Sequence, residues 1–204
     1  MEIPIHKETT THANEMMCAY CFDVLIAHFR GQRPSLPPFD GTVSVPMFVT
    51  LNSVSQKDSS LSLRGCIGTL SPKPLSSLAD FTHSSAFRDR RFEPLLEYEI
   101  ASLEISVSLL VAYEDIEHYL DWEVGVHGIL IEFEANNRKY SGTYLPEVAL
   151  AQRWTQQEAI YSLIRKAGYQ GAVTTEILNS IRVTRYQSSK ASLSYEKYGK
   201  RFHR

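Results

Sequence analysis

The stretch Leu63-Arg64-Gly65-Cys66-Ile67-Gly68-Thr69 places an arginine, a cysteine and two glycines in the second arm of a predicted β-hairpin. The first arm, Val43 to Leu51, is rich in strand-forming residues, and the polar link from Asn52 to Ser60 is typical of a hairpin loop. Glycine within a strand allows another group to come close to the backbone. The pattern therefore predicts a β-hairpin whose second strand can be approached closely at its glycines. The approaching group is either a ligand or another part of the protein that packs there.

The rest of the chain alternates between helical and strand-like patterns. Apolar residues at helical spacing predict a helix near residues 11–30, capped by Thr10 or Thr11, and further helices near 74–87, 146–153 and 155–167. Pro72 and Pro74 are expected to close the hairpin's second strand. Further strands are expected at residues 103–113, 128–133, 138–144 and 181–186. Because hairpins outnumber strand-helix-strand units, the pattern predicts an α+β fold with mostly antiparallel strands, flanked by helices.

Length and composition place limits on the class of protein. A chain of 204 residues with a formal net charge of -2 fits one large domain, or one domain with a smaller lobe, and gives no overall signal for nucleic acid. Its three cysteines, Cys18, Cys21 and Cys66, cannot all pair, which favours a reducing compartment. No signal peptide or long apolar stretch is present. We therefore expect a protein of the cytoplasm, the nucleus or both, without a membrane association.

Cys66 is the first candidate for chemistry. A catalytic thiol needs a lowered pKa, which a nearby arginine can supply, and Arg64 lies two residues before it on the same predicted strand face. The alternative is a buried cysteine that packs as a small apolar residue, which is the commoner case.

The second candidate is the turn Asp121-Trp122-Glu123-Val124-Gly125-Val126-His127-Gly128. It offers two carboxylates, Asp121 and Glu123, and an imidazole, His127, which is the best candidate for a general base in the chain. The alternative is a structural turn in which the polar side chains bind backbone amides.

Two stretches of the chain are rich in basic residues, and the first of them is the third candidate for a functional site. Arg88-Asp89-Arg90-Arg91-Phe92 holds three guanidinium groups in four residues, which can grip phosphate or carboxylate or can simply end a helix. The region after Gln187 is expected to be a basic, solvated tail. Cys18 and Cys21 form a C-x-x-C pair within a helix and without a second pair, so no zinc site is expected. No other metal-ligand spacing is present, and no cofactor can be named from the residues.

The chain resembles the AMMECR domain family, named for a human chromosomal region linked to Alport syndrome, midface hypoplasia and elliptocytosis, and in particular its eukaryotic members. The resemblance rests on the Leu63–Thr69 segment and on motifs spread in the expected order from about residue 14 to 199. The further motifs are Ala86–Phe92, Val107–Leu110, Asp121–Glu123 with Gly125-x-His127-Gly128, Thr143–Val148, Lys166–Tyr169 and Thr184–Tyr186.

The resemblance implies an α+β fold with a larger and a smaller lobe, and Leu63 to Gly68 is the family's hallmark. Prokaryotic relatives are associated with a Memo-type protein and a radical S-adenosylmethionine enzyme, which suggests a role in a modification pathway and a Memo-type protein as a partner. No reaction is assigned to the family. On this basis residues 1–187 form the AMMECR-like domain and 188–204 the basic tail.

Two hypotheses for the function remain open. In the first, an enzyme or substrate-handling subunit uses Cys66 as nucleophile, Arg64 as anion clamp and His127 as base, with Glu123 or Asp121 orienting that base. In the second, a non-catalytic module binds an anionic peptide or partner protein.

The ligand-binding candidates common to both hypotheses are polar residues and glycines. They lie on the arginine run and on three segments, Leu63–Thr69, Asp121–Gly128 and Thr143–Glu147. They are Arg64, Gly65, Gly68, Arg90, Arg91, Tyr144 and Glu147. Because polar groups at strand ends are costly to bury unpaired, the three segments are expected to converge on one concave surface.

Overall fold

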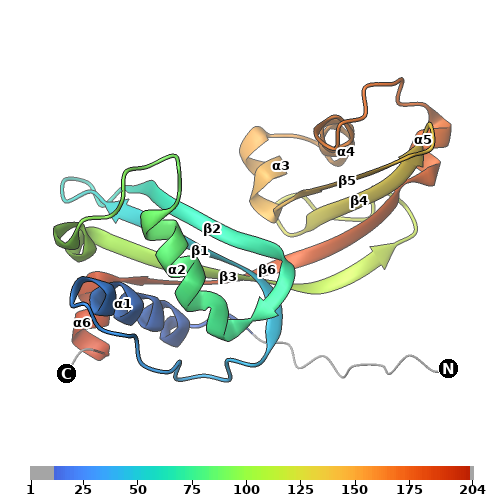
Figure 1. The fold of residues 1–204 in the computed structure, drawn as a ribbon. Helices are drawn as coiled ribbons and strands as arrows, with labels where there is room; N and C mark the ends of the chain where they lie inside the picture. Colours follow the sequence, from blue (N-terminus) through green and yellow to red (C-terminus); the bar gives the residue numbers. More distant parts are fainter. Residues whose placement is uncertain (1–11, 203–204) are drawn as a thin grey trace. The chain divides into compact units, whose positions relative to one another are not determined.

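The computed structural model describes residues 12–202, which divide into two compact units (Figure 1). The first unit contains the chain up to Leu109 and again from Ser189, and the second contains Leu110–Ser188. Two long strands, β3 (Leu103–Ile116) and β6 (Arg182–Ser194), contribute residues to both units. The chain therefore leaves and re-enters the first unit through strands.

Within the described residues the strands form one sheet in the order β2-β1-β3-β6-β4-β5. The pairs β1–β2, β1–β3, β4–β5 and β4–β6 are antiparallel, so the predicted α+β class with an antiparallel sheet core is confirmed. The other elements of the first unit are α1 (Glu15–Phe29), β1 (Ser44–Val54), β2 (Leu61–Pro74), η1 (Leu75–Ser77), α2 (Leu78–Phe87), η2 (Glu97–Ser102) and α6 (Tyr195–Arg201). Those of the second are β4 (Gly128–Ala135), β5 (Arg138–Tyr144), α3 (Pro146–Gln152), α4 (Gln156–Lys166) and α5 (Thr175–Ser180).

The start of the first helix and the end of the hairpin's second strand differ from the prediction. Helix α1 begins at Glu15, and the Asn14 side chain accepts a hydrogen bond from the Met17 amide as its cap. The expected caps Thr10 and Thr11 lie outside the described residues. Strand β2 continues through Pro72 and Pro74 because it is an edge strand, where a residue without an N–H breaks no ladder bond on the outer side.

The expected basic tail after Gln187 is wrong as a structural prediction. The last strand extends to Ser194, and α6 then packs on α1, with Tyr198 stacked on Phe22 at 4.9 Å between ring centroids. Arg201 pairs with Glu15. Residues 189–201 therefore belong to the first unit, and the predicted boundary at 187 falls inside β6.

The first unit is held together where α2 meets the β1–β2 hairpin. The Ser85 hydroxyl accepts from the Ile67 amide and donates to the Val49 carbonyl, both at 2.9 Å, and these two residues are register partners. A Cβ on Gly65 would lie 2.1 Å from the Ser85 carbonyl oxygen. Gly65 is therefore the residue that lets the helix backbone lie directly against the strand.

The second unit places its helices on one face of the β4–β5–β6 sheet (Figure 1). Alternate residues of β4, including Ile131 and Phe133, are buried against the helices, whereas Glu132 and Glu134 are exposed on the opposite face. Asn136 and Asn137 form the turn that joins β4 to β5, and both lie at positive φ, as a tight hairpin requires. Within residues 12–202, the helices are all too short or too polar to cross a membrane.

We predict that Gly65→Ala lowers the free energy of unfolding by about 3 kcal/mol or more, because the added methyl group meets backbone rather than a side chain that can move. Urea denaturation followed by circular dichroism measures this change. The control is Gly199→Ala in α6, where nothing lies within 4 Å of the new Cβ and a helical alanine is expected to be neutral or stabilising by up to about 1 kcal/mol. A Gly65→Ala protein as stable as wild type would contradict the proposed close packing.

Candidate functional site

Cys66 lies on β2 opposite Thr50 of β1, and the Thr50 hydroxyl donates to its sulfur at 3.3 Å. Because Gly65 faces α2, the Cys66 side chain points to the other face of the sheet. Thr50 is in turn opposite Ser106 of β3, whose hydroxyl is 2.8 Å from that of Ser192. A row of hydroxyl groups thus leads away from the half-buried thiol across the sheet.

Asp89 and Arg91 hold the backbone of Cys66 from the outer edge of β2. The Asp89 carboxylate accepts from the Cys66 amide at 2.9 Å, and the Arg91 guanidinium donates to the Cys66 carbonyl at 3.2 Å. The two side chains also bind each other, with Arg91 Nη2 2.7 Å from Asp89 Oδ2. These hydrogen bonds from Arg91 and from the amide of Cys66 hold the pKa of the buried Asp89 carboxyl well below its usual range.

Arg64 is engaged within the protein. Its guanidinium forms two hydrogen bonds with the Glu99 carboxylate, at 2.8 and 3.0 Å, and donates to the main-chain oxygens of Glu93 and Pro94. These contacts with Glu99 raise the pKa of Arg64 and lower that of Glu99. A role for Arg64 as an anion clamp would require this pairing to break.

The other arginines of the run lie at the surface. Within the described part of the chain, Arg88 and Arg90 are exposed and make no side-chain hydrogen bond or ion pair. The Arg91 side chain is 56% exposed although it is paired with Asp89. The loop after α2 therefore presents three guanidinium groups to solvent, next to the part of β2 around Cys66 that Asp89 and Arg91 hold.

His127 is bonded to its own turn in the second unit. Its Nδ1 accepts from the Glu123 amide at 3.1 Å, and its own amide donates to the Glu123 carbonyl. The Nδ1 atom of His127 is therefore occupied by the main chain of its own turn. The contacts of His127 run to the main chain of Glu123 rather than to a carboxylate.

Arg185, which the site prediction did not include, holds the same turn in place. It binds the Glu114 carboxylate at 2.7 Å, the Asp121 main-chain oxygen at 2.8 Å and the Asp121 carboxylate at 3.4 Å. Its presence in the Thr184–Tyr186 motif was the signal available in the sequence. Asp121 is therefore paired with Arg185, and in the described structure the exposed Glu123 side chain makes no hydrogen bond or ion pair with His127.

Tyr144 and Glu147 lie beside the buried ring of Tyr186. The Tyr186 hydroxyl donates to the Tyr144 carbonyl at 3.0 Å, and a Cβ on Gly128 would lie 2.4 Å from the Tyr186 ring. The Tyr144 hydroxyl is 2.9 Å from that of Ser162. Glu147 is exposed. Several family motif residues here serve packing around Tyr186.

The candidate residues fall into two groups, one in each unit. Cys66, with Arg64, Gly65, Gly68, Arg90 and Arg91, belongs to the first, whereas Asp121, Glu123, His127, Tyr144 and Glu147 belong to the second. Gly68, like Gly65, has a packing role, since its Cβ would lie 2.2 Å from the Met47 carbonyl oxygen. The convergence of the three segments on one surface stays a prediction.

The AMMECR1 family model matches residues 18–191, and the chain therefore belongs to the AMMECR1 family. An uncharacterized protein of Arabidopsis thaliana is 47% identical over 189 residues, which cover 91% of this chain and 87% of that protein. An uncharacterized protein of Schizosaccharomyces pombe is 45% identical over 184 residues, covering 89% and 93%. The crystal structure of an uncharacterized protein from Pyrococcus horikoshii shares the fold, with a TM-score of 0.64 at 24% identity and coverage of 89% and 91%.

We predict that a thiol reagent labels Cys66 alone in the native protein. Burial raises the pKa of both Cys18 and Cys21 to about 12, and neither has exposed surface, whereas Cys66 is half-buried. Mass spectrometry after labelling with iodoacetamide at neutral pH measures the site, and labelling in urea should modify all three cysteines. Native labelling of Cys18 or Cys21 at the rate of Cys66 would contradict the structure.

We also predict that Asp89→Asn destabilises the protein by about 2 kcal/mol at neutral pH, because hydrogen bonds to a charged group contribute roughly 1.5–3 kcal/mol. The folded-state pKa of Asp89 is depressed, so its contribution is complete above the unfolded pKa of about 4 and is lost as the pH falls below it. The stability difference between the two proteins should therefore shrink in acid. Urea titrations at several pH values measure it, with the exposed Arg90→Gln as a control expected to stay within about 0.5 kcal/mol.

Proposed function

We propose that this AMMECR1-family protein is a binding module that holds an acidic or phosphorylated segment of a partner protein with the loop Arg88–Phe92. The observation that carries the proposal is the exposure of Arg88, Arg90 and Arg91 beside a segment whose other polar groups are already engaged. Guanidinium groups bind phosphate and carboxylate with paired, planar hydrogen bonds.

The hydrogen bonds of Asp89 and Arg91 to the Cys66 backbone on β2 support this proposal. Asp89 fixes Arg91 and the Cys66 backbone, so the loop that carries the arginines is anchored on the sheet. An anchored cationic loop loses less conformational entropy on binding than a mobile one. Arg90 is free to turn toward a ligand, whereas Arg64 is paired with Glu99 and is left out of the proposed contact.

The enzyme hypothesis has weaker support from the same geometry. The Cys66 sulfur accepts a hydrogen bond from the hydroxyl of Thr50, and in the described structure no histidine or carboxylate side chain bonds to that sulfur. A nucleophilic cysteine is ordinarily paired with a base, and His127 accepts a main-chain hydrogen bond instead. Cys66 is nevertheless the one partly accessible cysteine, which makes it the residue to test.

Binding to an array of acidic and phosphoserine-containing peptides tests the proposal, with the full chain as the probe. We expect binding that weakens as salt is raised and that falls by about tenfold or more in the double variant Arg88→Gln, Arg90→Gln. Lys57→Gln, an exposed charge in the β1–β2 loop, is the control for simple loss of positive charge and should bind like wild type.

Cys66→Ser separates the two hypotheses in the same assay. A binding module keeps its peptide affinity in this variant, because the thiol is not part of the proposed contact. Peptide binding that is insensitive to the arginine substitutions, or that is lost with Cys66→Ser while the variant remains folded, would overturn the proposal. The three free cysteines support a cytoplasmic or nuclear location for such a partner.

A further inference from the structure

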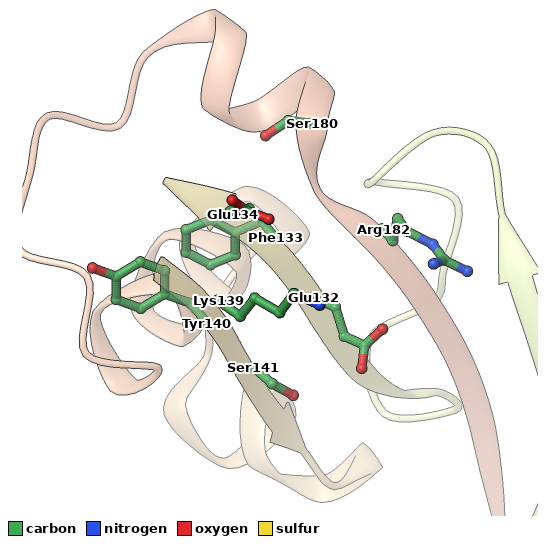
Figure 2. Close-up of a pocket in the computed structure, with 8 residues that line it drawn as sticks. All are labelled: Glu132, Phe133, Glu134, Lys139, Tyr140, Ser141, Ser180 and Arg182. Carbon is green, nitrogen blue, oxygen red and sulfur yellow. The ribbon is translucent and has the colours of Figure 1, made fainter. Parts of the chain in front are cut away.

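A hollow of about 440 Å³ lies in the second unit over strands β4, β5 and β6 (Figure 2). This volume is within the range of small-molecule sites. Figure 2 shows side chains of both charges around it, from three neighbouring strands. The charged lining residues are Glu132 and Glu134 on β4, Lys139 on β5 and Arg182 on β6, and the hydroxyls of Ser141 and Ser180 complete its polar rim.

The strand register places each carboxylate of the hollow directly across from a cation on a neighbouring strand. The register places Glu132 directly opposite Arg182 on one side and Ser141 on the other, and Glu134 opposite Lys139. The central strand therefore carries two carboxylates, and each flanking strand carries one cation. Adjacent strands lie about 4.8 Å apart, so the two cations stand on opposite sides of the acidic strand.

The four charged side chains are exposed and make no hydrogen bond or ion pair among the residues that the structure describes. Opposite charges directly across a sheet commonly attract one another. Here the carboxylates and the cations stay apart around a hollow, so each keeps its hydrogen-bonding capacity for another molecule.

We propose that this hollow binds a small zwitterion that has one ammonium group between two carboxylates, which is the chemistry of an acidic amino acid. Glu132 and Glu134 would accept from the ammonium group, while Lys139 and Arg182 each hold one carboxylate. The hydroxyls of Ser141 and Ser180 supply further hydrogen bonds at the rim. This site lies wholly within the second unit and is separate from the arginine loop of the first.

Titration of the ¹⁵N-labelled full chain with L-glutamate, followed by NMR, tests the proposal. We expect saturable shifts confined to amides of β4, β5 and the start of β6, with a dissociation constant on the order of 1 mM, because exposed ion pairs contribute little individually. Glutarate, which lacks the ammonium group, and L-leucine, which lacks the second carboxylate, should each bind about tenfold more weakly or not at all.

Two substitutions complete the test, and their spectra show directly that each variant is folded. Glu132→Gln and Arg182→Gln should each weaken glutamate binding about three- to fivefold, whereas Glu117→Gln, an exposed carboxylate of the same unit outside the hollow, should not change it. The absence of saturable shifts with glutamate would overturn the proposal. It would also be overturned by shifts elsewhere in the chain, by equal binding of glutarate, or by variants that bind like wild type.

Discussion

The hydrogen bond from the Cys66 amide to the Asp89 carboxylate is the contact on which the hallmark segment depends. A carboxylate with almost no exposed surface is stable only if its oxygens are bonded, and here the acceptors are filled by one strand amide and by Arg91. The loop after α2 is thereby fixed to β2. Ser85, one turn earlier, is placed to bridge the two strands, and Gly65 to admit the helix. The buried carboxylate of Asp89 thus fixes the relative positions of α2, the loop that follows it and the β1–β2 hairpin.

The second unit solves a comparable packing problem with an aromatic ring. Tyr186 fills the space above Gly128, and its hydroxyl binds the Tyr144 carbonyl. Arg185, beside it, reaches the other way to Glu114 and Asp121. Residues that mark the family in this unit therefore have clear structural roles. This separates them from Arg88 and Arg90, whose side chains are exposed and make no hydrogen bond or ion pair within the described structure.

Local patterns predicted the fold class, both hairpins and most helices, because turn residues and helical spacing act over a few positions. The last strand was placed too short, since the polar residues after Gln187 are held by pairing and by contacts with α1, far away in sequence. Separation in sequence also explains why the contacts of the candidate site could not be predicted. Arg64 has its partner Glu99 35 positions further on, and Cys66 lies 23 positions before Asp89. No spacing rule within one sequence predicts such pairs.

Strand β2 forms one border of the sheet, and such borders invite another chain to add a strand of its own. At Cys66 the outward-facing amide and carbonyl are already taken by Asp89 and Arg91. Further along the strand, Pro72 and Pro74 have no amide hydrogen to offer. The contacts of Asp89 and Arg91 that position the hallmark segment therefore also occupy backbone groups of this edge strand that could otherwise pair with a strand of another chain.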